Sequence, residues 1–117
     1  MYAEAVLRGG SGGDLGTAVT YVNKVRERAY AGTAGNITQS ELSLDFILDE
    51  RAREFYWECH RRTDLVRFGK FSETNYLWPY KGNSPTGESR PKFYDVFPIP
   101  ASDLGANPNL KQNPGYF

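Results

Sequence analysis

Residues 48–71 read LDERAREFYWECHRRTDLVRFGKF, and this stretch decides how the rest of the chain is interpreted. Acidic, basic and large aromatic side chains alternate here around the only cysteine, Cys59, and the only histidine, His60. Apolar residues recur from Leu44 at spacings of three and four, with charged residues on the flanks. The pattern predicts a long amphipathic helix that ends near His60. A shorter helix is expected at residues 62–68.

Helix boundary signals lie on both sides of this stretch. Gly69 has the place and type of a C-terminal glycine stop. Upstream, Asp14 is a plausible N-cap for a helix whose buried face is formed by Leu15, Ala18, Val19, Val22, Val25 and Ala29. The helix through Leu44 has two candidate starts, a capping box of Thr38 with Glu41 or a cap at Ser43. The sequence leaves both open.

The opening residues 1–8 are also expected to be helical, with no capping residue before them, which suggests a helix cut from a larger protein. Residues 9–13 read GGSGG, which fails the G-x-G-x-x-G phosphate pattern because Leu15 occupies the last glycine position. We interpret this run as a flexible connection between helices.

The C-terminal part, residues 71–117, has a different composition. All seven prolines lie from Pro79 onward, and aromatic residues remain frequent. A disordered tail would be poor in aromatics, so an ordered, irregular segment packed on the helices is expected. A turn capped by Ser102 and a short strand at residues 95–97 are its only expected elements. The predicted fold is all-α, one domain, helical in 1–70 and irregular in 71–117.

Charge and composition exclude several classes of function. The 14 basic and 14 acidic residues cancel, which argues against a nucleic-acid partner. One cysteine excludes an internal disulfide, and one cysteine with one histidine do not make a zinc site. We expect no metal and no cofactor. No apolar run approaches the roughly 20 residues of a membrane-spanning helix.

The charges of the central helix have two interpretations. Glu50, Glu54 and Glu58 follow one another at four-residue spacing, so their Cβ atoms would lie about 5–6 Å apart along one face. Paired carboxylates at such a separation suit a retaining glycosidase. Arginines are interleaved, however, and this favours a structural ion-pair network made by Glu50, Arg51, Glu54, Glu58, Arg61, Asp64 and Arg67.

Two further groups of residues are candidate sites. Cys59 and His60 are adjacent, and adjacent helical side chains do not face each other, so a packed cysteine and a hydrogen-bonded histidine are expected rather than a nucleophile pair. The run WPYKG places Trp78 and Tyr80 beside Lys81. Aromatic planes can stack on sugar rings while a lysine bonds hydroxyl groups, although core or interface packing of these rings is the commoner outcome.

Three blocks of the sequence together resemble a known family. These are ILDERAREFYWECHRRTDLVRFGKF, YLWPYKG and FPIPASDLGANPNLKQNPGY, in that order. They are similar to the C-terminal end of the SusD/RagB family of nutrient-binding outer-membrane lipoproteins, and YAEAVLRGG and YVNKVRERAY resemble the helical repeats before it. Cys59 and the pair Arg62-Thr63 depart from the pattern that many members have there.

The resemblance implies a C-terminal fragment of a longer protein with a tetratricopeptide-like helical hairpin scaffold. It implies non-enzymatic capture of oligosaccharides at the bacterial surface and transfer to a TonB-dependent transporter. The family's known glycan-contacting aromatics lie mainly outside this region, so Trp78, Tyr80 and Lys81 rest on chemistry alone. The alternative is a helical-repeat module that docks the transporter and has no glycan site in this fragment.

Overall fold

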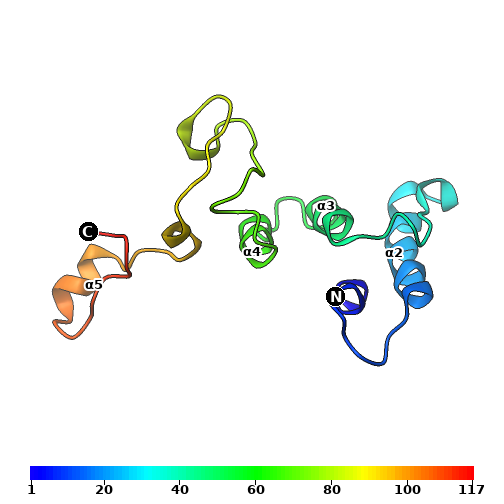
Figure 1. The fold of residues 1–117 in the computed structure, drawn as a ribbon, viewed down its shortest axis with the longest axis horizontal. Helices are drawn as coiled ribbons and strands as arrows, with labels where there is room; N and C mark the ends of the chain where they lie inside the picture. The colour runs from blue at the N-terminus through cyan, green and yellow to red at the C-terminus, as the bar shows by residue number, and fades with distance from the viewer. The chain divides into compact units, whose positions relative to one another are not determined.

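The computed structural model describes residues 1–117, which form helices and connecting segments without a strand (Figure 1). The all-α fold class predicted from the sequence is confirmed. Contacts within the chain gather in two compact units, Met1–Cys59 and His60–Phe117.

The first unit contains three α-helices, α1 (Tyr2–Leu7), α2 (Leu15–Tyr30) and α3 (Leu44–Glu54), and a short 3₁₀ helix, η1 (Thr33–Gly35). α1 packs against both α2 and α3, and α2 packs against η1. The rings of Tyr2 and Tyr21 meet edge to face, with centroids 5.1 Å apart. The buried apolar side chains are Ala3, Ala18, Val22, Ile37, Leu42, Ile47 and Leu48.

The helix starts follow from local capping chemistry. Asp14 accepts a hydrogen bond from the Thr17 amide at 2.8 Å, which confirms it as the N-cap of α2. Ser43 accepts from the Phe46 amide at 3.1 Å, so α3 begins at Leu44. The Thr38 amide and hydroxyl both donate to Glu41, and these bonds close a separate turn before the helix.

The end of α3 differs from the prediction. The helix stops at Glu54 instead of near His60. Trp57 and Cys59 have φ angles of 68° and 61°, in the left-handed region, where an α-helix does not continue. The expectation of a packed Cys59 is also wrong, because this residue is exposed.

Arg26 connects three segments of the first unit. Its Nε donates to the Gly35 carbonyl in η1, and its Nη1 lies 2.6 Å from the Glu50 carboxylate in α3. Its guanidinium also stacks against the Phe46 ring, 5.4 Å from the centroid. Both ionic side chains are largely buried, at 12% and 14% exposed. Arg26 therefore joins α2 to the elements that follow it.

The second unit is mostly irregular. It contains α4 (Arg61–Arg67), η2 (Lys81–Asn83), η3 (Lys92–Asp95) and α5 (Ala101–Ala106). Gly69 ends α4 with φ +67°, and the Lys70 amide donates to Leu65 at 2.8 Å, which confirms the predicted glycine stop. Leu65 is the one buried apolar residue in this unit.

Two local predictions for the second unit need correction. Ser102 lies inside α5, and the residue before the helix is Pro100, so the predicted serine cap is wrong although the turn exists. No strand forms at residues 95–97, because the Val96 amide donates to the Phe93 carbonyl and closes η3. Gln112 bonds both the amide and the carbonyl of Ile99, which satisfies extended backbone without a partner strand.

Replacing Arg26 by alanine is expected to lower the free energy of unfolding by about 2 kcal/mol, because the Gly35 carbonyl and the largely buried Glu50 both lose a charged donor, while Arg53 still pairs with Glu50. Urea unfolding followed by circular dichroism measures this. Arg28→Ala is the matched control on the same helix, since Arg28 pairs with Glu54 but is 69% exposed, and should change little. Equal losses in the two variants would contradict the role given to Arg26.

Candidate functional site

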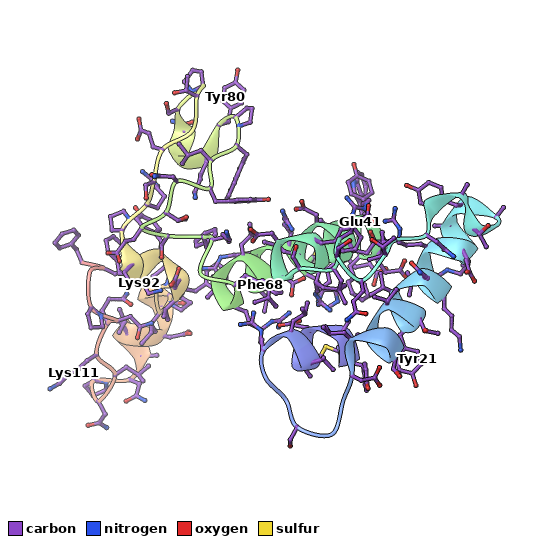
Figure 2. All side chains as sticks on the ribbon, turned by 45° about the vertical axis from the view of Figure 1, so that its right-hand side comes forward. Tyr21, Glu41, Phe68, Tyr80, Lys92 and Lys111 are labelled. Atoms are coloured by element: carbon purple, nitrogen blue, oxygen red, sulfur yellow. The ribbon has the colours of Figure 1, made fainter.

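Residues 73–90 form a loop that is closed at its base. The Glu73 amide donates to the Arg90 carbonyl at 2.9 Å, and the Thr74 amide donates to the Ser89 hydroxyl at 3.1 Å. Within the loop, the Glu88 amide donates to the Lys81 carbonyl at 2.9 Å. Tyr80 lies at the outer end of this loop (Figure 2). These bonds give the loop a defined shape without regular secondary structure.

The fold of the loop requires glycine at position 87. Gly87 is buried, has φ +79°, and lies so close to Trp78 that an added Cβ would be 2.4 Å from the Trp78 carbonyl oxygen. That separation is far below a van der Waals contact. The close approach brings the second half of the loop against the WPYKG segment and fixes the backbone of Trp78.

The loop and the segments that flank it enclose a pocket of about 370 Å³. All three residues predicted as a ligand site line this pocket: Trp78, Tyr80 and Lys81. Sequence reasoning missed the other lining residues, which are Phe71, Gly82, Asn83, Arg90 and Tyr94. The base of the loop, at Glu73 and Arg90, brings these distant residues together. Apart from the glycines at positions 82 and 87, nothing in the sequence predicts that the loop closes between Glu73 and Arg90.

Lys81 is the most unusual residue of the pocket. Its side chain is buried, at 4% exposed, although lysine is almost never buried without a partner. Its Nζ donates to the Tyr76 carbonyl at 2.7 Å and lies 4.6 Å from the centroid of the Trp78 ring. Burial lowers the pKa of Lys81 below its ordinary value. The Lys81 ammonium therefore connects the backbone at Tyr76 to the ring of Trp78 within the loop.

The aromatic residues of the pocket differ in exposure. Trp78 is half-buried, and its ring meets Tyr76 edge to face at 6.4 Å. Tyr80 is 72% exposed and has φ 65°, so its ring stands at the rim. Tyr94 lies under the Arg90 guanidinium, 4.9 Å from the ring centroid. The pocket therefore has a fixed tryptophan, an open tyrosine and a tyrosine covered by a cation.

The residues predicted to form an ion-pair network divide between the two units. In the first, Glu50 contacts Arg26 and Arg53, and Glu54 contacts Arg28. In the second, Asp64 lies 2.9 Å from Arg67, and Arg61 donates to the Tyr76 hydroxyl at 2.6 Å. Arg51 stacks on Phe55, and Glu58 lies beyond the end of α3 and is exposed. Sequence reasoning missed Arg26 and Arg28 on α2.

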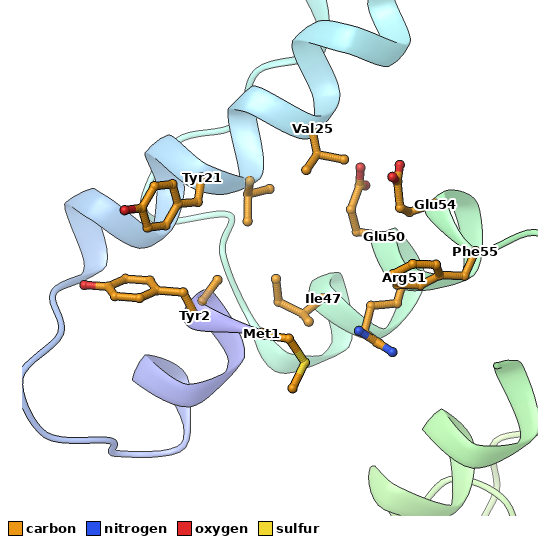
Figure 3. Close-up of a pocket in the computed structure, with 11 residues that line it drawn as sticks. Met1, Tyr2, Tyr21, Val25, Ile47, Glu50, Arg51, Glu54 and Phe55 are labelled. Carbon is orange, nitrogen blue, oxygen red and sulfur yellow. The ribbon is translucent and has the colours of Figure 1, made fainter.

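A second pocket, of about 250 Å³, lies among α1, α2 and α3 in the first unit (Figure 3). Glu50 and Glu54 reach its edge, where their carboxylates point toward α2. Its other lining is mainly apolar and includes Tyr2, Val25 and Ile47. Both carboxylates contact arginines, since Glu50 lies against Arg26 and Glu54 against Arg28.

Two further features bear on function. No three or more histidine, cysteine, aspartate or glutamate side chains come together in a way that could hold a metal ion. None of the helices combines the length and the apolar character needed to cross a membrane.

Comparison with known proteins gives a consistent result. The model of the SusD family matches residues 1–116. The chain is 44% identical over 115 residues to the starch-binding protein SusD of Bacteroides thetaiotaomicron, covering 97% of this chain and 19% of that protein. It is 38% identical over 105 residues to the SusD-like protein P25 of Formosa agariphila, covering 82% of this chain and 19% of that protein.

A solved structure agrees with these relatives. The crystal structure of a SusD superfamily protein from Bacteroides vulgatus matches with a TM-score of 0.66 and 32% identity. The match covers 98% of this chain and 25% of that structure. The chain spans about a fifth of the length of the two curated relatives, SusD and the SusD-like protein P25.

The buried Lys81 predicts a pH dependence of stability. Because its folded pKa lies below the unfolded value of 10.5, the unfolded chain binds more protons between these two values, and stability gains from this group as pH rises through that window. As pH rises toward 10.5, we expect the free energy of unfolding to increase relative to that of a Lys81→Met variant measured at the same pH. A pH-independent difference between the two proteins would refute it.

The close approach at Gly87 predicts a large effect of one methyl group. Gly87→Ala should lower the free energy of unfolding by about 2 kcal/mol or more, because the methyl group overlaps a backbone carbonyl at a positive φ. Gly105→Ala is the matched control, since Gly105 lies in α5 with open space around it. Thermal unfolding of both variants tests this, and a harmless Gly87→Ala would show that the loop closes differently.

Proposed function

Because the chain belongs to the SusD family, we propose that it binds oligosaccharides without chemical turnover, in the pocket formed by Trp78, Tyr80 and Lys81. The observation that carries this proposal is the convergence of the three residues on one pocket. A relative that shares 44% identity with the chain is named a starch-binding protein.

The chemistry of the pocket suits a sugar ring. Aromatic faces pack against the C–H face of a pyranose, and a few polar groups at the rim fix its orientation. Trp78 is held in place by its neighbours, while Tyr80 is free to cover a ligand from the rim. The Asn83 side chain and the Lys81 ammonium supply donors for hydroxyl groups.

The arrangement of carboxylates supports a binding role instead of hydrolysis. No carboxylate lines the pocket of Trp78, and the acids at the other pocket contact arginines. Most retaining and inverting glycosidases use two carboxyl groups that flank the scissile bond. We infer that the protein acts by capture, as a surface lipoprotein of the outer membrane that passes glycans to a TonB-dependent transporter.

The second candidate function is docking of another protein, such as that transporter. Tyr56 and Trp57 follow α3 and are 75% and 87% exposed, with ring centroids 6.2 Å apart. Exposed aromatics of this kind are enriched among the residues that dominate protein interfaces. On this alternative the fragment contributes an interface and no glycan site.

Trp78→Ala is expected to weaken oligosaccharide binding tenfold or more, because truncating a stacked ring removes roughly 1.5–3 kcal/mol of contact. Isothermal titration calorimetry of the chain with a panel that includes maltoheptaose measures the affinity. Trp57→Ala is the matched control and should leave it unchanged.

The same two variants separate the functions. Loss of co-purification with a co-expressed TonB-dependent transporter in Trp57→Ala, with no binding of any glycan by the unmodified chain, would favour docking. Unchanged glycan affinity in Trp78→Ala would remove the site from this pocket.

A further inference from the structure

The walls of the candidate pocket carry positive charge only. Lys81 and Arg90 are its ionisable cationic groups, and no carboxylate lines it. This is unexpected in a chain whose acids and bases are equal in number and interleaved. The local excess therefore arises from the way the loop folds and not from composition.

The acids near the loop do not neutralise these cations. Asp95 lies 2.6 Å from Lys92 and is engaged there. Glu73 and Glu88 are exposed and contact the loop through their backbone amides, which donate to Arg90 and Lys81 carbonyls. Neither Lys81 nor Arg90 makes an ion pair with a carboxylate in the structure.

Lys81 is the strongest feature of this site. An ammonium has three donors, and the protein accepts one of them, at the Tyr76 carbonyl. The only other compensation for its charge is the face of Trp78. Burying a charge with so little compensation is unfavourable, and such groups concentrate where a ligand completes their interactions. An anionic group on the ligand would supply the missing partner.

Arg90 is suited to the same task. It is half-buried and its guanidinium stacks on Tyr94, which limits its rotamers. Its side chain also runs beside Gly82, next to Lys81, where an added Cβ would lie 3.1 Å from the Arg90 Cδ. A planar guanidinium fixed in this way can bind a carboxylate or a sulfate through two parallel hydrogen bonds.

We propose that this pocket selects acidic glycans, in which a sugar stacks on Trp78 and Tyr80 while a uronate carboxylate or a sulfate ester binds Lys81 and Arg90. The proposal rests on the proposed function, since it names the class of glycan that the same pocket takes. A neutral glycan would engage the aromatic rings and leave both cations without an ionic partner.

A carbohydrate microarray that holds neutral, uronic acid and sulfated oligosaccharides tests the proposal on the 117-residue chain. Acidic probes are expected to dominate, and the strongest is then titrated beside its neutral counterpart, made by carboxyl reduction or desulfation. We expect the acidic form to bind tenfold tighter or more, because an ionised ligand group forms charge-assisted hydrogen bonds with Lys81 and Arg90. The uronate and sulfate arms identify which anion is preferred.

Lys81→Met and Arg90→Gln should each lower the affinity for the acidic form more than the affinity for its neutral counterpart, so that the preference shrinks. Lys111→Met, which removes an exposed lysine outside the pocket, should leave it intact. Equal affinity for the acidic and neutral forms, or a preference that survives both pocket variants, would overturn the charge selection and leave glycan binding standing. Absence of binding to every probe, maltoheptaose included, would reject the proposed function and this inference together.

Discussion

The second unit, His60–Phe117, depends on hydrogen bonds that side chains donate to backbone carbonyls, because few apolar side chains are buried there. In His60–Phe117 one apolar side chain, Leu65, is buried, and most of the backbone lies outside helices. Long cationic and amide side chains supply the hydrogen bonds to the backbone that a sheet or a helix would supply elsewhere. Arg62 donates to the Tyr94 carbonyl at 2.6 Å while its guanidinium packs 3.8 Å from the Phe97 ring centroid. Lys81 and Gln112 act in the same way on Tyr76 and Ile99. A cationic side chain that lies over an aromatic ring covers the apolar ring face, and its N–H groups can still donate hydrogen bonds to backbone carbonyls.

The same arrangement creates the candidate site, because the contacts that hold the loop also form the walls of its pocket. Trp78 is fixed by the ammonium behind it and by the backbone of Gly87. A ligand that stacks on this ring meets a surface whose orientation is already set, so little conformational entropy is lost on binding. Tyr80 has no such support and can adjust to what is bound. Stability and recognition are therefore coupled in this loop more closely than in the helical unit.

The parts of the fold that sequence predicted are those set by nearby residues. Asp14 and Gly69 act within one turn of helix, and their side-chain types are sufficient to identify them. The end of α3 was missed because Trp57 and Cys59 adopt positive φ without being glycine or asparagine. Arg26 was missed because its partner, Glu50, lies 24 residues away. The residue types alone indicated Trp78, Tyr80 and Lys81 as a candidate site, whereas Arg90 joins their pocket through the long-range bond between the Glu73 amide and the Arg90 carbonyl.

The burial of Lys81 is the point at which folding and function oppose each other. A methionine would fill the same space without the cost of removing an ammonium from water, but it would leave the Tyr76 carbonyl without its donor. Carrying the charge lowers the stability of the loop at neutral pH, as the direction of its pKa shift indicates. A bound anion would reverse that shift by favouring the ammonium, and the binding free energy would then stabilise the fold. The loop would then be more stable with an anion bound than when empty.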